Sequence, residues 1–155
     1  MAGRKRKQGL EYSSWDVDVY DDRKILSLTD SEGYGAFTVY FVLCQQIYAS
    51  GGYYLPWTEG DVPWMKRLLG GGITSEKVAA VVERCLQIGL FDQEIYRKYG
   101  VLTSRGIQRT FAIVVQKRRC RDVIRELWLL SPEESGGATL VPAEMAGAPQ
   151  FAGSK

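Results

Sequence analysis

Residues 89–119 constrain the fold more than any other part of the sequence. Gly89 follows an amphipathic stretch, and a residue without Cβ can adopt the left-handed conformation that closes a helix. Two short apolar pairs follow, Leu90-Phe91 and Val101-Leu102, and each is long enough for one short strand. Thr103-Ser104 then offers side-chain oxygens that can cap a further helix, which becomes progressively more basic. The order of helix, small sheet and basic helix predicts a domain that holds something negatively charged.

Further elements are expected before this stretch. They are an extended segment at residues 10–20, helices at 23–28, 36–49, 59–69 and 75–88, a strand at 53–55 and a short helix within 92–99. Two helices joined by Gly70-Gly71-Gly72, after a helix and a strand, form a helix-turn-helix candidate. Pairing of the three short strands completes a winged-helix arrangement. The predicted fold class is mainly α with a small β-sheet, a winged helix-turn-helix with a long basic C-terminal helix.

The chain divides into three predicted segments. Residues 1–9 are expected to form a disordered basic tail, and residues 10–130 a winged-helix domain that includes the C-terminal helix. At about 100° per residue, Arg118 falls where that helix needs its next inward apolar residue. The helix is therefore expected to leave the domain near Gln116 and to project a basic collar. Residues 131–155 are rich in Gly, Ala, Pro and Ser and are predicted to be a disordered tail.

Composition excludes several classes of protein. A chain of 155 residues without an apolar run of about 18 residues or an apolar signal core predicts one domain outside the membrane. Three widely separated cysteines indicate thiols in a reducing compartment, so a cytoplasmic location is expected. The absence of histidine excludes histidine-dependent nucleophile pairs and the common zinc motifs. The chain is accordingly expected not to be an enzyme and to use no cofactor or metal.

Two motifs resemble sites of phosphate chemistry, but each lacks residues that such chemistry needs. The carboxylates of Asp16, Asp18, Asp21 and Asp22 resemble a magnesium cluster, but no catalytic partner accompanies them, and helix capping accounts for the last two. The Gly70-Gly71-Gly72 run lacks the Gly-Lys-Ser/Thr ending of a phosphate loop. We interpret it as a turn.

Charge is unevenly distributed along the chain. Four consecutive cations occupy residues 4–7, thirteen acidic residues oppose six basic ones in residues 8–96, and nine basic residues accompany one acid in residues 97–125. This asymmetry favours a polyanion partner, although a solvated helix face would give the same pattern. The candidate DNA-binding residues are Arg4, Lys5, Arg6, Lys7, Lys77, Arg84, Arg97, Lys98, Arg105, Arg109, Lys117, Arg118, Arg119 and Arg121. About five phosphate contacts would give a log K against log salt slope near −4 to −5.

Two further surfaces are candidates for contact with nucleic acid or protein. The second helix of the helix-turn-helix carries Lys77 and Arg84, but nearby carboxylates dilute them, so sequence-specific reading of DNA is not expected. Aromatic residues cluster around the first strand. They could stack on single-stranded bases, but the scarcity of interleaved cations favours an oligomer interface. That predicted interface comprises Trp15, Tyr53, Tyr54, Trp57 and Trp64.

Several sequence blocks occur in the order found in one protein family. They are residues 10–12 and 15–22, then Gly52-Tyr53-Tyr54-Leu55, Gly89-Leu90-Phe91-Asp92 and residues 99–108. Together they resemble the N-terminal domain of DnaD-like replication proteins, in the branch found in phages and mobile elements. The resemblance covers about residues 9–117 and implies a winged helix, replication initiation on DNA and self-assembly. Such proteins usually carry a separate C-terminal domain, so this chain is expected to be either a fragment or a short stand-alone member.

The sequence therefore predicts a non-enzymatic winged-helix protein that binds DNA mainly through phosphates and takes part in replication initiation. The expected partners are DNA, bound in a largely nonspecific and salt-sensitive way, replication proteins, and further copies of the same chain. One alternative is an oligomerisation or adaptor module that binds protein. The other is a small transcriptional regulator, which would need a better reading helix than residues 75–88.

Overall fold

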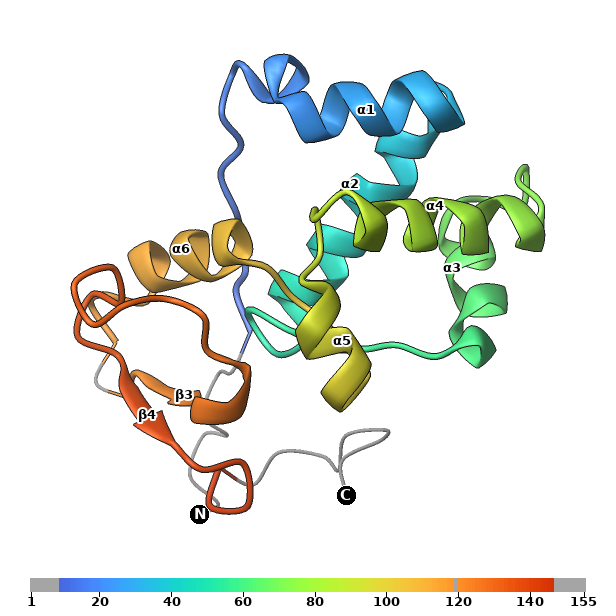
Figure 1. The fold of residues 1–155 in the computed structure, drawn as a ribbon. Coiled ribbons are helices and arrows are strands. Elements are labelled where there is room, and N and C mark those ends of the chain that lie inside the picture. Colours follow the sequence, from blue (N-terminus) through green and yellow to red (C-terminus); the bar gives the residue numbers. More distant parts are fainter. Residues whose placement is uncertain (1–8, 119, 147–155) are drawn as a thin grey trace.

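The computed structural model describes residues 9–118 and 120–146, and most of its regular structure is helical (Figure 1). The α-helices of this part of the chain are α1 (Arg23–Glu32), α2 (Gly35–Ala49), α3 (Val62–Leu68), α4 (Ser75–Gln87), α5 (Gln93–Tyr99) and α6 (Arg105–Val114). The short strands are β1 (Leu55–Pro56), β2 (Val101–Leu102), β3 (Asp122–Ile124) and β4 (Thr139–Val141). Single 3₁₀ turns lie at Val19–Asp21 (η1), Glu59–Asp61 (η2) and Arg125–Leu127 (η3). The fold is thus mainly α with small sheets, as predicted.

Helix α2 forms the centre of the core and contacts α1, α4 and α6. Its apolar residues recur at helical spacing, and Val39, Leu43, Cys44 and Ile47 are each at most 1% exposed. In Figure 1, α1 lies above this helix, α3 and α4 lie to its right, and α6 lies to its left. The helix predicted at residues 36–49 is confirmed.

The ends of the helices follow local sequence signals. Asp22 caps α1 by accepting from the amides of Lys24 and Ile25, and Thr74 caps α4 by accepting from Lys77. Ser104 caps α6 through the amide of Ile107. Gly89, just beyond α4, has φ 83°, which a residue with a side chain adopts only with strain. The caps at Asp22 and Ser104 and the stop at Gly89 confirm the sequence predictions.

The predicted small sheet forms in part. Strand β1 pairs antiparallel with β2, with Leu55 opposite Leu102 and Pro56 opposite Val101. Leu90 and Phe91 do not form the third strand, because their amides bond instead to the carbonyl of Cys85 at the end of α4. The chain then enters α5, the short helix expected within residues 92–99.

The long basic C-terminal helix is not present in the structure. Helix α6 ends at Val114, and the chain turns back so that Val123, Ile124 and Leu127 are at most 4% exposed. A helix continuing away from the domain would leave these side chains in water, whereas burial stabilises each by roughly 1.5–3 kcal/mol. The basic collar therefore does not project from the domain.

Part of the predicted disordered tail is ordered. Residues 131–137 form turns, and β4 follows and pairs parallel with β3, with Val123 opposite Leu140 (Figure 1). The composition of this segment misled the prediction, because its ordering depends on contacts with α6 rather than on its own apolar content. The remaining residues of the two predicted tails, 1–8 and 147–155, lie outside the described residues.

No helix in the described ranges combines the length and apolar character needed to cross a membrane. Cys44 in α2 and Cys85 in α4 are buried, and Cys120 is exposed. Cys120 was expected on a helix, but it follows the end of α6.

Candidate functional site

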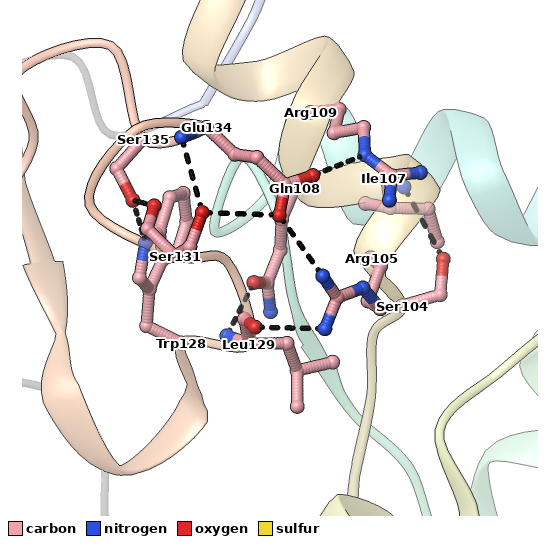
Figure 2. Close-up of polar contacts among 10 residues, drawn as sticks. All are labelled: Ser104, Arg105, Ile107, Gln108, Arg109, Trp128, Leu129, Ser131, Glu134 and Ser135. Carbon is pink, nitrogen blue, oxygen red and sulfur yellow. Dashed lines mark hydrogen bonds and ion pairs between the residues drawn. The ribbon is translucent and has the colours of Figure 1, made fainter.

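Two arginines at the start of α6 converge on one carboxylate. Arg105 and Arg109 are one helical turn apart, so their side chains share a face of α6. Arg105 Nη2 lies 2.9 Å from Glu134 Oε1, and Arg109 Nε lies 3.0 Å from Glu134 Oε2 (Figure 2). Each carboxylate oxygen therefore accepts from a different guanidinium. This is the geometry that would also hold a phosphate, which presents several acceptor oxygens to arginine.

The electrostatics of the pair are consistent with a charged Glu134. The hydrogen bond from Arg109 is the main influence that lowers the pKa of the Glu134 carboxyl, and Ser131 and the charge of Arg105 add to it. The arginine side chains are 53% and 51% exposed and that of Glu134 is 33% exposed. Ion pairs this exposed contribute little to stability, because solvent screens them. Another anion can therefore compete for the arginines at low energetic cost.

Gln108 fastens the C-terminal segment to α6 beneath this pair. Its side chain is fully buried, and its Nε2 donates to the carbonyl of Leu127 at 2.8 Å and to Thr103 Oγ1 at 3.1 Å. Its Oε1 accepts from the amide of Leu129 at 2.8 Å. Arg105 Nη1 reaches the carbonyl of that same Leu129 at 3.2 Å. One buried amide group thus sets the position of residues 127–129 beside the arginines.

The turn that carries Glu134 is held by its own hydrogen bonds. Ser131 Oγ donates to Glu134 Oε1 at 3.2 Å, and Ser135 Oγ donates to the carbonyl of Ser131 at 2.6 Å. Trp128 Nε1 donates to Ser135 Oγ at 2.8 Å (Figure 2). The indole ring of Trp128 packs edge-on against Tyr53, with ring centroids 5.4 Å apart. The turn therefore keeps its shape through contacts that do not involve the arginines.

Other predicted DNA-binding cations near this turn hold backbone carbonyls. Arg121 Nη1 donates to the carbonyl of Gly136 at 3.0 Å and to that of Gln116 at 3.3 Å. Arg118 Nη2 donates to the carbonyl of Gly9 at 2.9 Å. These guanidinium groups therefore hold Gly9 and the turn at Gly136 against the domain.

The cations of α4 face α1 rather than open solvent. Lys77 Nζ lies 2.8 Å from Glu32 Oε2, and Arg84 donates to the hydroxyls of Ser31 and Ser27 at 3.1 and 3.3 Å. The exposed residues of α4 include Glu76 and Glu83. A helix that reads the major groove would present donors there. Lys77 and Arg84 therefore contact α1, and the absence of base reading by this helix stays a prediction.

Besides Arg105 and Arg109, three predicted cations of the described residues are exposed after α4. Arg97 and Lys98 occupy the last turn of α5, and Lys117 lies in the turn after α6. Arg97 forms an ion pair with Glu94. This pair is weak because both side chains are exposed to solvent. Arg4, Lys5, Arg6, Lys7 and Arg119 lie outside the described residues.

The predicted oligomer interface is divided by the fold. Tyr53, Tyr54 and Trp57 are 4–6% exposed and belong to the core. Burial raises the pKa of the Tyr53 hydroxyl. Its Oη accepts a hydrogen bond from the amide of Ile124 at 2.7 Å. Trp64 is partly buried against the core. Trp15 lies apart from the three buried rings and contacts Phe41, with ring centroids 5.0 Å apart. The five aromatic residues therefore do not share one surface.

Sequence reasoning missed Glu134 and Gln108. Gln108 was detectable, because it lies between Ile107 and Phe111 on the apolar stripe of α6, where a polar residue needs buried partners. Glu134 gave no comparable signal, since it lies 25 residues beyond Arg109 in a segment poor in large apolar residues. Among the described residues, no group of three or more potential metal ligands converges.

The fold and this site define a small, mainly helical domain whose C-terminal segment is fastened to its last helix by buried and charged contacts. The chain belongs to the Lin1244/Lin1753-like family, because residues 12–107 match the model of the N-terminal domain of that family. It is similar to the uncharacterised phage-related protein Lin1244/Lin1753 of Listeria innocua, with 30% identity over 132 residues. The alignment covers 84% of this chain and 42% of that relative, so the chain spans about two-fifths of its length. No solved structure matches the chain.

Proposed function

We propose that this chain is a non-enzymatic, DnaD-like DNA-binding domain that acts in replication initiation in a phage or mobile element. It binds DNA weakly and largely without sequence preference, through phosphate contacts. The exposed cations that follow the acidic body of the chain carry this proposal. The phage-related character of the family supports the setting.

The order of elements supports a winged-helix type of domain. Helix α2, strand β1, helices α3 and α4, and strand β2 follow one another, and β1 pairs with β2. Helix α5 occupies the place where a winged helix has its second strand and wing. The cations of α4 contact α1. We therefore propose that cations on other elements bind the DNA phosphates and that α4 does not read bases in the major groove.

The distribution of open charge supports phosphate binding. Lys98 and Lys117 are exposed, and residues 97–125 hold nine basic residues against one acid. A duplex carries one negative charge per about 1.7 Å, so such a segment gains affinity by releasing counterions. The same reasoning predicts steep weakening in salt.

The proposal is tested by fluorescence anisotropy with a labelled duplex and a labelled single strand at several salt concentrations. We expect a log K against log salt slope near −4 to −5 for the full chain, and Lys117→Ala to make it less negative by about 0.9 on the duplex. Arg67→Ala is the matched control, because Arg67 is an exposed cation in the last turn of α3, within the acidic part of the chain. A slope near zero, or equal losses in the two variants, contradicts phosphate binding by the C-terminal third.

Self-association is a second candidate function, favoured by one observation. Tyr12, Val17 and Tyr20 are more than half exposed, and they lie in the segment that packs along α2. Tyr20 contacts Phe37, and Trp15 contacts Phe41. Exposed apolar residues concentrated in one short segment are a feature of protein interfaces. We call these residues, with Trp15, Phe37 and Phe41, the N-terminal aromatic surface and propose a second copy of the chain as its partner.

A further inference from the structure

The arginines predicted to bind DNA at the start of α6 already hold an anion. Glu134 supplies that anion from the turn at residues 131–137, which lies along α6. A Cβ added to Gly136 in this turn would meet the Ala112 carbonyl oxygen at 3.7 Å and Gln116 Nε2 at 3.5 Å. The turn thus covers the side of α6 from which Arg105 and Arg109 project.

We infer that Arg105 and Arg109 form a binding site for one or two backbone phosphates of nucleic acid, and that Glu134 occupies this site in the absence of nucleic acid. The inference rests on the proposed DNA-binding function and assigns it a site and an internal competitor. Glu134 leaves the site by rotation of its side chain. The turn itself stays in place through Ser135, Trp128 and Gln108.

The balance of contacts makes such an exchange reversible. The two ion pairs are about half exposed on the arginine side, and ion pairs this exposed are weak. A phosphate likewise offers the arginines several acceptor oxygens, and its binding also releases condensed counterions. Glu134 remains in the site when salt screens the phosphates and yields it when nucleic acid is present at low salt.

Glu134→Gln tests the inference, with Glu133→Gln as the matched control. Glu133 is the exposed neighbour of Glu134, so both variants lose one negative charge, but only Glu134→Gln removes the carboxylate that pairs with the arginines. In Glu134→Gln no ion pair has to be broken before the arginines bind phosphate, whereas Glu133→Gln keeps the competitor. Glu134→Gln should therefore bind duplex several-fold more tightly than Glu133→Gln at 50 mM salt. Circular dichroism verifies that both variants fold.

The remaining outcomes separate this inference from the proposed function. If wild-type protein binds DNA and the two glutamine variants behave alike, Glu134 does not compete and only the further inference is overturned. If no variant binds DNA at 50 mM salt, both are overturned. Adding Arg105→Ala and Arg109→Ala to Glu134→Gln should cancel the gain in duplex affinity. If the gain persists, the phosphates do not bind at these arginines and the further inference is overturned.

A second arm distinguishes backbone phosphate from free phosphate. The Nε–Hε NMR signals of Arg105 and Arg109 are followed in Glu134→Gln while inorganic phosphate or duplex DNA is added. We expect duplex to shift both signals at a lower phosphate concentration than the inorganic ion does. Equal or stronger response to inorganic phosphate would assign the site to a small anion and overturn the nucleic-acid inference.

Discussion

At the scale of single residues, Gln108 determines whether the C-terminal segment stays attached to α6. Its side chain is fully buried and makes three hydrogen bonds, to Thr103 and to the backbone of Leu127 and Leu129. Thr103 extends the network, because its hydroxyl donates to the carbonyl of Tyr53 beside β1. A buried polar network of this kind stabilises one arrangement only while all its members are satisfied.

Gln108→Ala should therefore destabilise the protein by about 2–4 kcal/mol, because it leaves the Leu129 amide and the Leu127 carbonyl without their partner at the buried end of α6. Urea denaturation followed by circular dichroism measures the change. Gln93→Ala is the control, since Gln93 is exposed at the start of α5 and its loss should change stability by less than about 0.5 kcal/mol. Equal effects of the two substitutions would show that the network does not hold the segment.

At the scale of elements, two glycines beside β2 respond oppositely to the same substitution. Gly100 ends α5 in the left-handed conformation, φ 66° and ψ 29°, and its carbonyl accepts from the amide of Trp57 at 2.9 Å. Gly106 lies in the first turn of α6, where an added Cβ would come no closer than 4.0 Å to the nearest atom, Ser104 Oγ. The first position needs glycine and the second does not.

Gly100→Ala should accordingly destabilise the protein by about 1–2 kcal/mol, because a side chain in the left-handed region clashes with its own backbone. Gly106→Ala should stabilise it by about 0.4–1 kcal/mol, mainly by restricting the unfolded chain. Thermal melts of both variants test the pair. Loss of stability in Gly106→Ala would indicate that the first turn of α6 needs a closer backbone approach than the structure shows.

These caps also show what the sequence could predict. Ser104, Thr74 and Gly89 act through neighbours in the chain, so their roles follow from local chemistry. The end of α6 depends on distant partners. Val123 and Ile124 fit either one side of a longer helix or a buried strand. The strand is stabilised by Tyr53, 71 residues before Ile124, whose hydroxyl oxygen accepts a hydrogen bond from the amide of Ile124. Periodicity within the segment does not contain that information.

For the same reason, the sequence predicted only part of the candidate site. Arg105 and Arg109 were recognised because charge along the chain is visible in the sequence. Glu134 was not, because its role arises only when the turn after Trp128 packs along α6. Opposite charges 25 or more residues apart meet only if tertiary contacts bring them together. Composition described the segment as low in apolar residues, but it did not reveal the serine, tryptophan and glutamine contacts that order it.

At the scale of the whole molecule, the two proposed functions have opposite salt dependence. DNA binding through phosphates weakens as salt rises. The N-terminal aromatic surface lies in a segment with Asp16, Asp18, Asp21 and Asp22, so two copies that meet there also bring like charges together. Salt screens that repulsion and favours the apolar contact. Salt titration of the same sample therefore separates the two activities.

Size-exclusion chromatography with light scattering should show a 17.4 kDa monomer in equilibrium with a dimer, and the dimer fraction should rise between 50 and 500 mM salt because the acidic residues are then screened. Val17→Asp should abolish the dimer, because Val17 is fully exposed and a charge there must be desolvated when the surface is covered. Ile113→Asp adds the same charge at an exposed position of α6, distant in sequence from this surface, and should leave the dimer intact. A monomer at every protein and salt concentration would reject self-association. A dimer lost equally in both variants would place the contact elsewhere.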